Sequence, residues 1–184
     1  MRKIVIAVSG VPGAGKTTYA RFIAEEYKLR YVSNGQLFRQ YAKEKGIALI
    51  EIHKMAEKDP SIDKEIDMRA IKEAEKGGVV IDGHLAVWIL KDLAHLKIIF
   101  TAPLEVRASR VSSRDKKPIE EAIKELLARE KSNKMRAKKY YNIDVDDYSV
   151  ADLMVNTEKL DVIGVKKVVK TFINEYKRLR PELF

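Results

Sequence analysis

The chain has 184 residues, no cysteine and a formal net charge of +9 at pH 7. This length accommodates one hydrophobic core but not two full domains, and the absence of cysteine excludes disulfides and thiolate metal sites. No run approaches the roughly 20 apolar residues that span a bilayer. We therefore expect a single cytoplasmic domain with no membrane partner.

The excess of positive charge has two interpretations. It fits a surface that attracts nucleic acid or nucleotide phosphates. It also fits a heat-adapted surface, because Lys and Glu are abundant while Gln occurs only twice. We favour the second interpretation, expect neither DNA nor RNA as a partner, and take a monomer as the simplest state.

Five short apolar or β-branched runs of strand length recur along the chain. Most are apolar throughout, which is typical of parallel strands covered on both faces. Amphipathic helical patterns separate them, and this alternation predicts right-handed crossovers in an α/β fold with a helix-flanked parallel sheet. The predicted strands lie at residues 3–8, 29–32, 78–82, 96–101 and 152–157.

A glycine-rich stretch, "VSGVPGAGKTTYA" at residues 8–20, follows the first strand and opens an amphipathic helix. Its spacing is that of a phosphate loop and differs from the GxGxxG of dinucleotide-binding folds. The glycines let backbone N–H groups approach a phosphate, and the helix N-terminus adds further donors. We therefore predict a bound nucleoside triphosphate. The predicted ATP-binding residues are Gly10, Val11, Pro12, Gly13, Ala14, Gly15, Lys16, Thr17 and Thr18.

About 45 residues separate the second and third predicted strands, more than one crossover helix requires. Pro60 and the flanking glycines divide them into three helical segments, which predict a small helical insertion beside the sheet. A lysine-rich helical pattern over roughly residues 118–141 forms a second extra element.

The transferred phosphate has two broad fates, water or a small molecule. Nothing in the chain resembles the guanine-reading NKxD motif that many GTPases carry. A helical insertion after the second strand suits a kinase that closes over its acceptor and excludes water. A kinase is therefore the favoured class.

Further motifs, in order over nearly the whole chain, resemble the archaeal type of cytidylate kinase, a family of nucleoside monophosphate kinases. They accompany the phosphate loop and the closing helix. The motifs are "SNGQLFR" (33–39), "EKDPSIDKEIDMR" (57–69), "IDGHLAVW" (81–88), "APLEVRASR" (102–110), "ARE" with "NKMR" (128–136) and "YYNIDVDDYSVADLMVNT" (140–157).

The resemblance implies a five-stranded parallel sheet, an insertion that binds the monophosphate, a short lid, and direct in-line transfer of the γ-phosphoryl group of ATP to CMP or dCMP with Mg²⁺. It divides the single domain into a core at 1–32, 78–113 and 142–184, a monophosphate-binding insertion at about 33–77, and a lid with the following helix at about 110–141. Adenylate or uridylate kinase activity, and a nucleotide-gated RNA-binding factor, remain the alternatives.

Arginine suits an acceptor that arrives as a phosphate dianion, because its planar guanidinium binds phosphate in a bidentate manner. By resemblance, Arg39 holds the acceptor phosphate. Arg107 and Arg110 lie at the base of the lid, while Arg129 and Arg136 come from the helix beyond it and reach the transferring phosphates. With Lys16, these last four are the predicted catalytic residues.

The remaining predicted site residues follow the third strand or open the insertion. Thr17 is expected to bind Mg²⁺, and Asp82 to order it through water or to contact the acceptor. With Arg39, the residues Gly35, Asp82, Gly83 and His84 complete the predicted acceptor site. No general base is required, because the attacking group is already an anionic phosphate oxygen.

Three positions stand apart from the family pattern or outside the predicted site. His84 stands where the family commonly has an arginine, and Asn34 occupies a position that is usually small. Arg114 is expected to be a lid residue or plain surface. The first two departures concern the acceptor and not the class of reaction.

Overall fold

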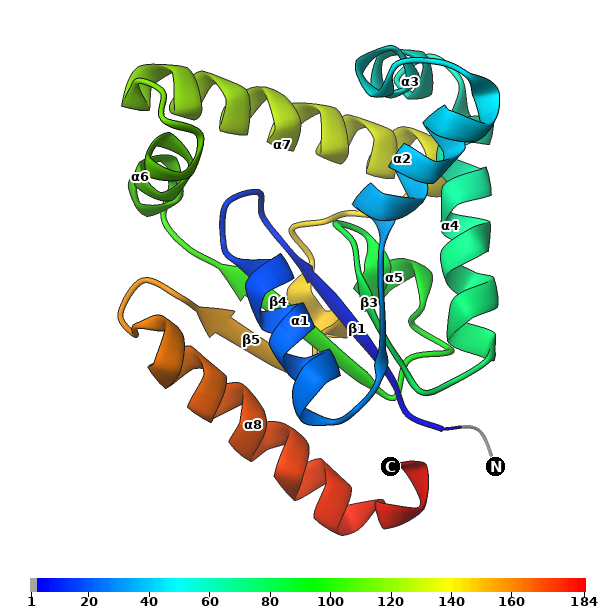
Figure 1. Ribbon diagram of the computed structural model, residues 1–184, viewed down its shortest axis with the longest axis vertical. Helices are drawn as coiled ribbons and strands as arrows, with labels where there is room; N and C mark the ends of the chain where they lie inside the picture. The colour runs from blue at the N-terminus through cyan, green and yellow to red at the C-terminus, as the bar shows by residue number, and fades with distance from the viewer. Residues whose placement is uncertain (1–2) are drawn as a thin grey trace.

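The computed structural model describes residues 3–184, except for the side chains of residues 49, 50 and 53. Its five strands form one parallel sheet in the order β2-β3-β1-β4-β5 (Figure 1). This confirms the predicted α/β fold with a five-stranded parallel sheet. The strands are β1 (Val5–Gly10), β2 (Arg30–Ser33), β3 (Val79–Asp82), β4 (Leu96–Thr101) and β5 (Leu153–Asn156).

Helices follow or separate the strands at nearly every step. The α-helices are α1 (Lys16–Glu26), α2 (Asn34–Lys45), α3 (Leu49–Ala56), α4 (Pro60–Glu75), α5 (Ala86–Ile89), α6 (Leu104–Asp115), α7 (Ile119–Tyr141) and α8 (Val162–Leu179). Two short 3₁₀ turns lie at Tyr148–Val150 and Pro181–Leu183.

The central strand β1 is buried on both faces. Ile6 and Val8 point into a core with helices α1 and α8, whereas Val5 and Ala7 point into a second core with α4 and α5. Alternate side chains of a strand lie on opposite faces, so an uninterrupted apolar run is what a sheet covered by helices on both sides requires.

The segment between β2 and β3 forms the three predicted helices. Ser33 caps α2 by accepting a hydrogen bond from the N–H of Gln36, and Asp59 caps α4 in the same way through Ser61. The three helices share their own apolar cluster, which includes Phe38, Ile52 and Ile66. This small core lets the insertion stand beside the sheet.

Helix α7 crosses one end of the sheet from α6 to the insertion (Figure 1). At its start it packs on α6 through a cluster that includes Val111 and Leu126. Near its end, the Tyr140 hydroxyl lies 3.0 and 2.7 Å from the carbonyl oxygens of Ala56 and Glu57. The helix therefore ties α6 to the insertion. In the described part of the chain, none of the helices combines the length and the apolar character that crossing a bilayer requires.

Candidate functional site

The phosphate loop joins β1 to α1 in a conformation that needs glycine. Gly13 and Gly15 have φ angles of +82° and +88°, in the left-handed region. A Cβ on Gly10 would lie 2.1 Å from the carbonyl oxygen of Phe100 on β4. The loop can therefore turn tightly against the sheet, with the first N–H groups of α1 at its mouth.

Side chains from distant segments hold this loop in place. Arg107 donates from Nε to the Ala102 carbonyl at 2.8 Å and from Nη1 to the Pro12 carbonyl at 3.0 Å, and it forms an ion pair with Glu130 of α7. The Thr157 hydroxyl lies 3.2 Å from the carbonyl oxygen of Ala14. Both contacts fix the backbone on which phosphate binding depends.

Lys16, Thr17 and Asp82 meet at the carboxyl ends of β1 and β3. The Thr17 hydroxyl donates to Asp82 Oδ2 at 2.7 Å, and the Tyr31 hydroxyl donates to the same oxygen at 2.9 Å. Burial lowers the pKa of the half-buried Lys16, and the nearby Asp82 carboxylate opposes that shift. Asp82 Oδ1 is buried and accepts no hydrogen bond from the described residues.

This arrangement fits Mg²⁺ as it is held in kinases. Mg²⁺ prefers oxygen ligands and usually keeps several waters, with one or two protein ligands and substrate phosphates completing its shell. The Thr17 hydroxyl and the unpaired Asp82 Oδ1 supply such oxygens side by side. No group of three or more His, Cys, Asp or Glu side chains suited to a metal occurs among the described residues.

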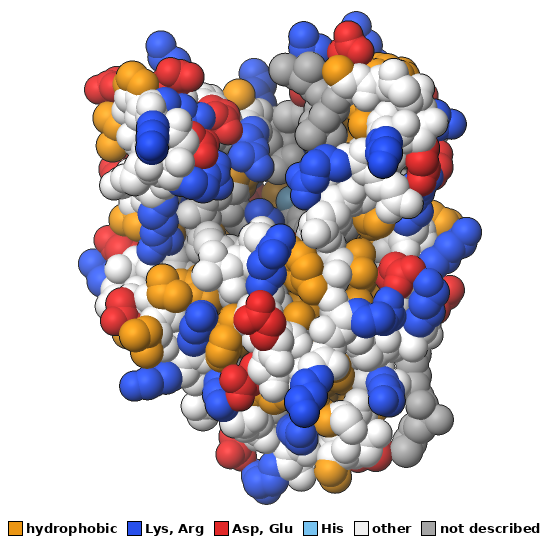
Figure 2. All heavy atoms as spheres, in the orientation of Figure 1, with side chains coloured by type: hydrophobic (Ala, Val, Ile, Leu, Met, Phe, Trp, Pro, Cys, Tyr) orange, Lys and Arg blue, Asp and Glu red, His pale blue; other side chains and the backbone are white. Residues whose placement is uncertain are grey.

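Part of the phosphate loop, at Pro12, Lys16 and Thr17, lines one large cleft of about 840 Å³. In Figure 2 the molecule is hollowed between two lobes, the α6–α7 region and the α2–α3 region, and lysine and arginine side chains gather around the opening. Positive side chains from four different helices reach it. They are Lys16 and Arg21 of α1, Arg39 of α2, Arg114 of α6, and Arg129 and Arg136 of α7.

Predicted residues on both sides of the reaction line this cleft. Pro12, Lys16 and Thr17 come from the donor side. The whole predicted acceptor set lines it as well, from two separate segments of the chain. Those residues are Gly35, Arg39, Asp82, Gly83 and His84.

The five predicted arginines divide into two groups. Arg39, Arg129 and Arg136 line the cleft, and exposed Arg39 makes no hydrogen bond or ion pair with the described residues. Arg107 and Arg110 are not among the described residues that line the cleft. Arg110 donates to the hydroxyl and carbonyl oxygens of Thr157 at 2.8 and 2.7 Å. The contacts of these two favour a role in holding the loop, and their direct catalytic role stays a prediction.

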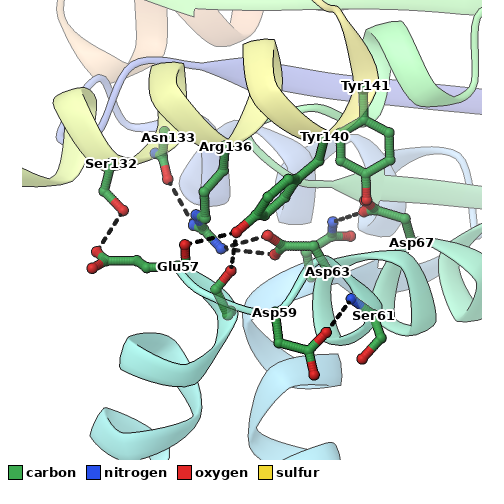
Figure 3. Close-up of polar contacts among 12 residues, drawn as sticks. Glu57, Asp59, Ser61, Asp63, Asp67, Ser132, Asn133, Arg136, Tyr140 and Tyr141 are labelled. Carbon is green, nitrogen blue, oxygen red and sulfur yellow. Dashed lines mark hydrogen bonds and ion pairs between the residues drawn. The ribbon is translucent and has the colours of Figure 1, made fainter.

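A buried polar network joins α4 to α7 on the side of the cleft that is predicted to hold the acceptor (Figure 3). Arg136 Nη1 lies 2.7 and 2.9 Å from the two carboxylate oxygens of Asp63. The Tyr141 hydroxyl donates to Asp67 Oδ2 at 2.5 Å, and Asn34 Nδ2 donates to Asp67 Oδ1 at 3.1 Å. Burial is the main cause that raises the pKa of Asp67 to about 6.

Sequence reasoning missed several cleft residues. Arg114 lines the cleft from α6, whereas the sequence left open whether it belongs to the lid or to the plain surface. Arg21 stacks at 5.0 Å over the ring of Tyr31, which in turn orients Asp82. No spacing in the sequence joins these residues, because they belong to different elements.

The fold and the site define a phosphate-loop kinase. Similar folds occur in an uncharacterized protein from Eubacterium ventriosum (TM-score 0.71, 21% identity, 94% of this chain and 99% of the other) and in shikimate kinase from Acinetobacter baumannii (TM-score 0.60, 17% identity, 95% of both chains). At these identities the likeness shows the fold alone.

Comparison of the amino-acid sequence with known families and proteins identifies the family. Residues 5–159 match the model of the cytidylate kinase-like family. Cytidylate kinases from Staphylothermus marinus, Pyrobaculum islandicum and Methanocaldococcus jannaschii are 47%, 49% and 46% identical to the chain. The matches cover 94%, 92% and 95% of this chain and 98%, 92% and 100% of the relatives. The chain belongs to the cytidylate kinase-like family.

Proposed function

We propose that the chain transfers the γ-phosphoryl group of ATP to CMP or dCMP. The observation that carries this proposal is the convergence of positive side chains from α1, α2, α6 and α7 on one cleft that the phosphate loop also lines. Two anionic substrates that lie side by side repel each other. Positive side chains that line the cleft offset this repulsion. The relatives named above supply the identity of the acceptor.

In this proposal the donor is held by the backbone of the loop and by Lys16. The loop N–H groups and the α1 N-terminus bind the β- and γ-phosphates, and Lys16 offsets the charge that develops on the transferring group. The lowered pKa of Lys16 reflects its desolvated position, and an adjacent triphosphate favours its charged form. Thr17 and Asp82 would hold Mg²⁺, which neutralises charge on the phosphates.

The acceptor is held from the opposite side. Arg39 is free to bind the acceptor phosphate, and Arg114 and Arg129 stand across the cleft from the insertion on α6 and α7. The attacking phosphate oxygen needs no base, so the residues contribute position and charge rather than proton transfer. Closure of the lid over both substrates would exclude water and so prevent hydrolysis of ATP.

A substrate panel tests the proposal. Purified protein is incubated with ATP, Mg²⁺ and one of CMP, dCMP, UMP, AMP or GMP, and ADP and the nucleoside diphosphate are measured together. We expect CMP and dCMP to be converted most efficiently, with equal amounts of ADP and nucleoside diphosphate. Turnover of AMP or UMP alone would assign another monophosphate kinase activity, and no turnover of any monophosphate would refute the proposal.

A further inference from the structure

Several buried polar atoms beside the cleft lack a partner. Asn34 Oδ1, Asp82 Oδ1 and Arg136 Nε are all buried and form no hydrogen bond within the described part of the chain. All three belong to residues that line the cleft. Buried polar groups in folded proteins are nearly always paired, so their common location indicates that a bound ligand completes them.

The three atoms face different parts of the reaction. Asp82 lies beside Thr17 and Lys16 on the donor side, where a metal-bound water would satisfy its oxygen. Asn34 and Arg136 belong to the acceptor side, on α2 and α7. The phosphate-accepting substrate therefore meets one unpaired hydrogen-bond acceptor, Asn34 Oδ1, and one unpaired hydrogen-bond donor, Arg136 Nε.

The orientation of the Asn34 amide is set by its neighbours. Asp67 receives the Tyr141 hydroxyl on Oδ2 and the Asn34 NH₂ group on Oδ1. An ionised carboxylate only accepts hydrogen bonds, so a flipped Asn34 would place oxygen against oxygen. A Cβ on Gly83 would lie 2.8 Å from Asn34 Cγ, so the amide rests directly on this glycine. The network thus keeps Oδ1 as the unpaired end.

The two pyrimidines differ at the group that such an oxygen can read. Cytosine carries an amino group at C4, which donates, and uracil carries a carbonyl oxygen there, which accepts. We propose that Asn34, oriented by Asp67 and Tyr141, accepts a hydrogen bond from the C4 amino group of the acceptor base and so selects cytosine over uracil. This inference rests on the proposed phosphorylation of CMP.

Uracil is rejected in this arrangement because its O4 would face Asn34 Oδ1 and leave two acceptors unpaired in a buried site. Unmet buried hydrogen bonds correspond to a discrimination of roughly 5- to 150-fold. Asn34 is only 7% exposed and belongs to the lining of the cleft, so a base that contacts it meets an amide that is already largely desolvated. Asn34 is therefore a specificity-determining residue of the acceptor site.

The first test combines one variant with one altered substrate. The kcat/KM of wild type and Asn34→Ala is measured for CMP and for the monophosphate of the pyrimidin-2-one riboside, which lacks the amino group. We expect wild type to prefer CMP by about tenfold or more, and Asn34→Ala to lose most of this preference. A structural effect alone would lower both values equally, and an unchanged preference would overturn the inference.

Two controls accompany this test. Gln36→Ala removes an amide two residues along the same helix, on an exposed side chain outside the cleft lining, and should keep the wild-type preference. Thermal unfolding reports whether each variant folds. If Asn34→Ala does not fold, the wild-type comparison still decides, because equal turnover of CMP and the analogue overturns the inference. Failure of wild type to phosphorylate CMP would instead refute the proposed function.

A second variant reverses the orientation of the amide. In Asp67→Asn, the new side chain accepts from Tyr141 through its oxygen and turns its NH₂ group toward Asn34. Asn34 must then present Oδ1 to that group and its own NH₂ to the base, which suits uracil O4. We expect the ratio of kcat/KM for CMP to that for UMP to fall about tenfold or more, with a gain for UMP. An unchanged ratio in a folded variant would overturn the role of Asp67.

Discussion

The donor and acceptor halves of the cleft are built in different ways. In the proposed function the donor half is mainly a continuous stretch, residues 10–18, whose backbone N–H groups and one lysine would bind the triphosphate. The acceptor half is assembled from side chains of three helices, and its network runs from Asn34 on α2 through Asp67 on α4 to Tyr141 on α7. All nucleoside triphosphates carry the same phosphate groups, so backbone N–H groups are sufficient to bind them. Distinguishing one base from another requires particular side chains.

The two halves also differ in how they affect the stability of the folded state. The phosphate loop relies on glycine conformations, with the charged side chains of Asp82 and Arg107 buried beside it. The acceptor half buries two carboxylates, Asp63 and Asp67, each within contact of a partner on α7. Removing charges from water is unfavourable even when they are paired. We therefore expect substitutions in the donor half to affect catalysis, and substitutions in the acceptor network to affect stability and specificity together.

The largest expected effect belongs to the donor half. Lys16→Ala removes the cation that stabilises the transferring phosphoryl group, so we expect kcat to fall about 1,000-fold, or about 4 kcal/mol. The free energy of unfolding should change by less than about 1 kcal/mol, because Lys16 has no packing role in the core. Steady-state kinetics and urea unfolding measure the two effects.

The matched control for this substitution is Lys167→Ala on the exposed face of α8, which removes the same charge far from the cleft. Its kinetics should match those of wild type. Normal turnover by Lys16→Ala would mean that the phosphate loop is not the donor site, and the contrast between the two halves would fail.

The next effect concerns the stability of the acceptor half. Burial raises the pKa of Asp67 to about 6 in the folded chain, above the value of about 3.9 for an unfolded aspartate. The folded state therefore binds the proton more tightly, and ionisation destabilises it as the pH rises through 6. Asp67→Asn removes this penalty, so its stability relative to wild type should be greater at pH 7.5 than at pH 4 by up to about 3 kcal/mol.

Urea unfolding at both pH values measures this difference. Asp92→Asn, on an exposed residue between α5 and β4, changes the same charge without burial and serves as the control. A stability difference between wild type and Asp67→Asn that is the same at pH 4 and pH 7.5 would show that Asp67 titrates alike in the folded and unfolded chain. The stability contrast between the halves would then be wrong.

The contrast between the halves also explains what the sequence could predict. Apolar runs with helical patterns between them identify a parallel sheet, because burial on both faces leaves a local record in each strand. The phosphate loop is equally local, since the glycines, Lys16 and Thr17 are neighbours in the chain. Arg39 and Asp82 were placed by resemblance to a family and by the end of a strand, and both line the cleft.

The acceptor network left no such local record. Asp67 and Tyr141 are 74 residues apart, and Asn34 and Asp67 are 33 apart, so no spacing rule connects them. The same limit applies to the arginines. Their residue type predicts phosphate binding, which stays a prediction, while the hydrogen bond from Arg107 to the carbonyl of Pro12 is a contact that only the tertiary structure reveals.

A smaller effect is expected for the acceptor phosphate. Arg39→Ala removes a charged hydrogen-bond donor from the mouth of the cleft, so we expect the KM for CMP to rise roughly 10- to 100-fold while the KM for ATP changes little. Lys43→Ala, one turn further along α2 and outside the cleft lining, tests for a general loss of charge. Equal changes in both KM values would place Arg39 outside the acceptor half.

The smallest expected effect lies at the boundary of the two halves, on Tyr31. Its hydroxyl holds Asp82 Oδ2 together with the hydroxyl of Thr17, which leaves Oδ1 free to meet a metal-bound water. In Tyr31→Phe the carboxylate keeps only one of these two bonds and samples more orientations. We expect the Mg²⁺ concentration for half-maximal rate to rise about threefold, equivalent to less than about 1 kcal/mol.

Calorimetric titration of Mg²⁺ into the protein with bound ADP gives a measurement of the same effect that does not depend on turnover. Tyr27→Phe is the matched control, because it removes a hydroxyl that bonds to Asn174 on α8, away from the cleft. If Tyr31→Phe instead weakens the binding of CMP and leaves the Mg²⁺ requirement unchanged, Asp82 contacts the acceptor rather than the metal. The boundary between the two halves would then pass between Asp82 and Thr17, even though the two side chains are joined by a 2.7 Å hydrogen bond.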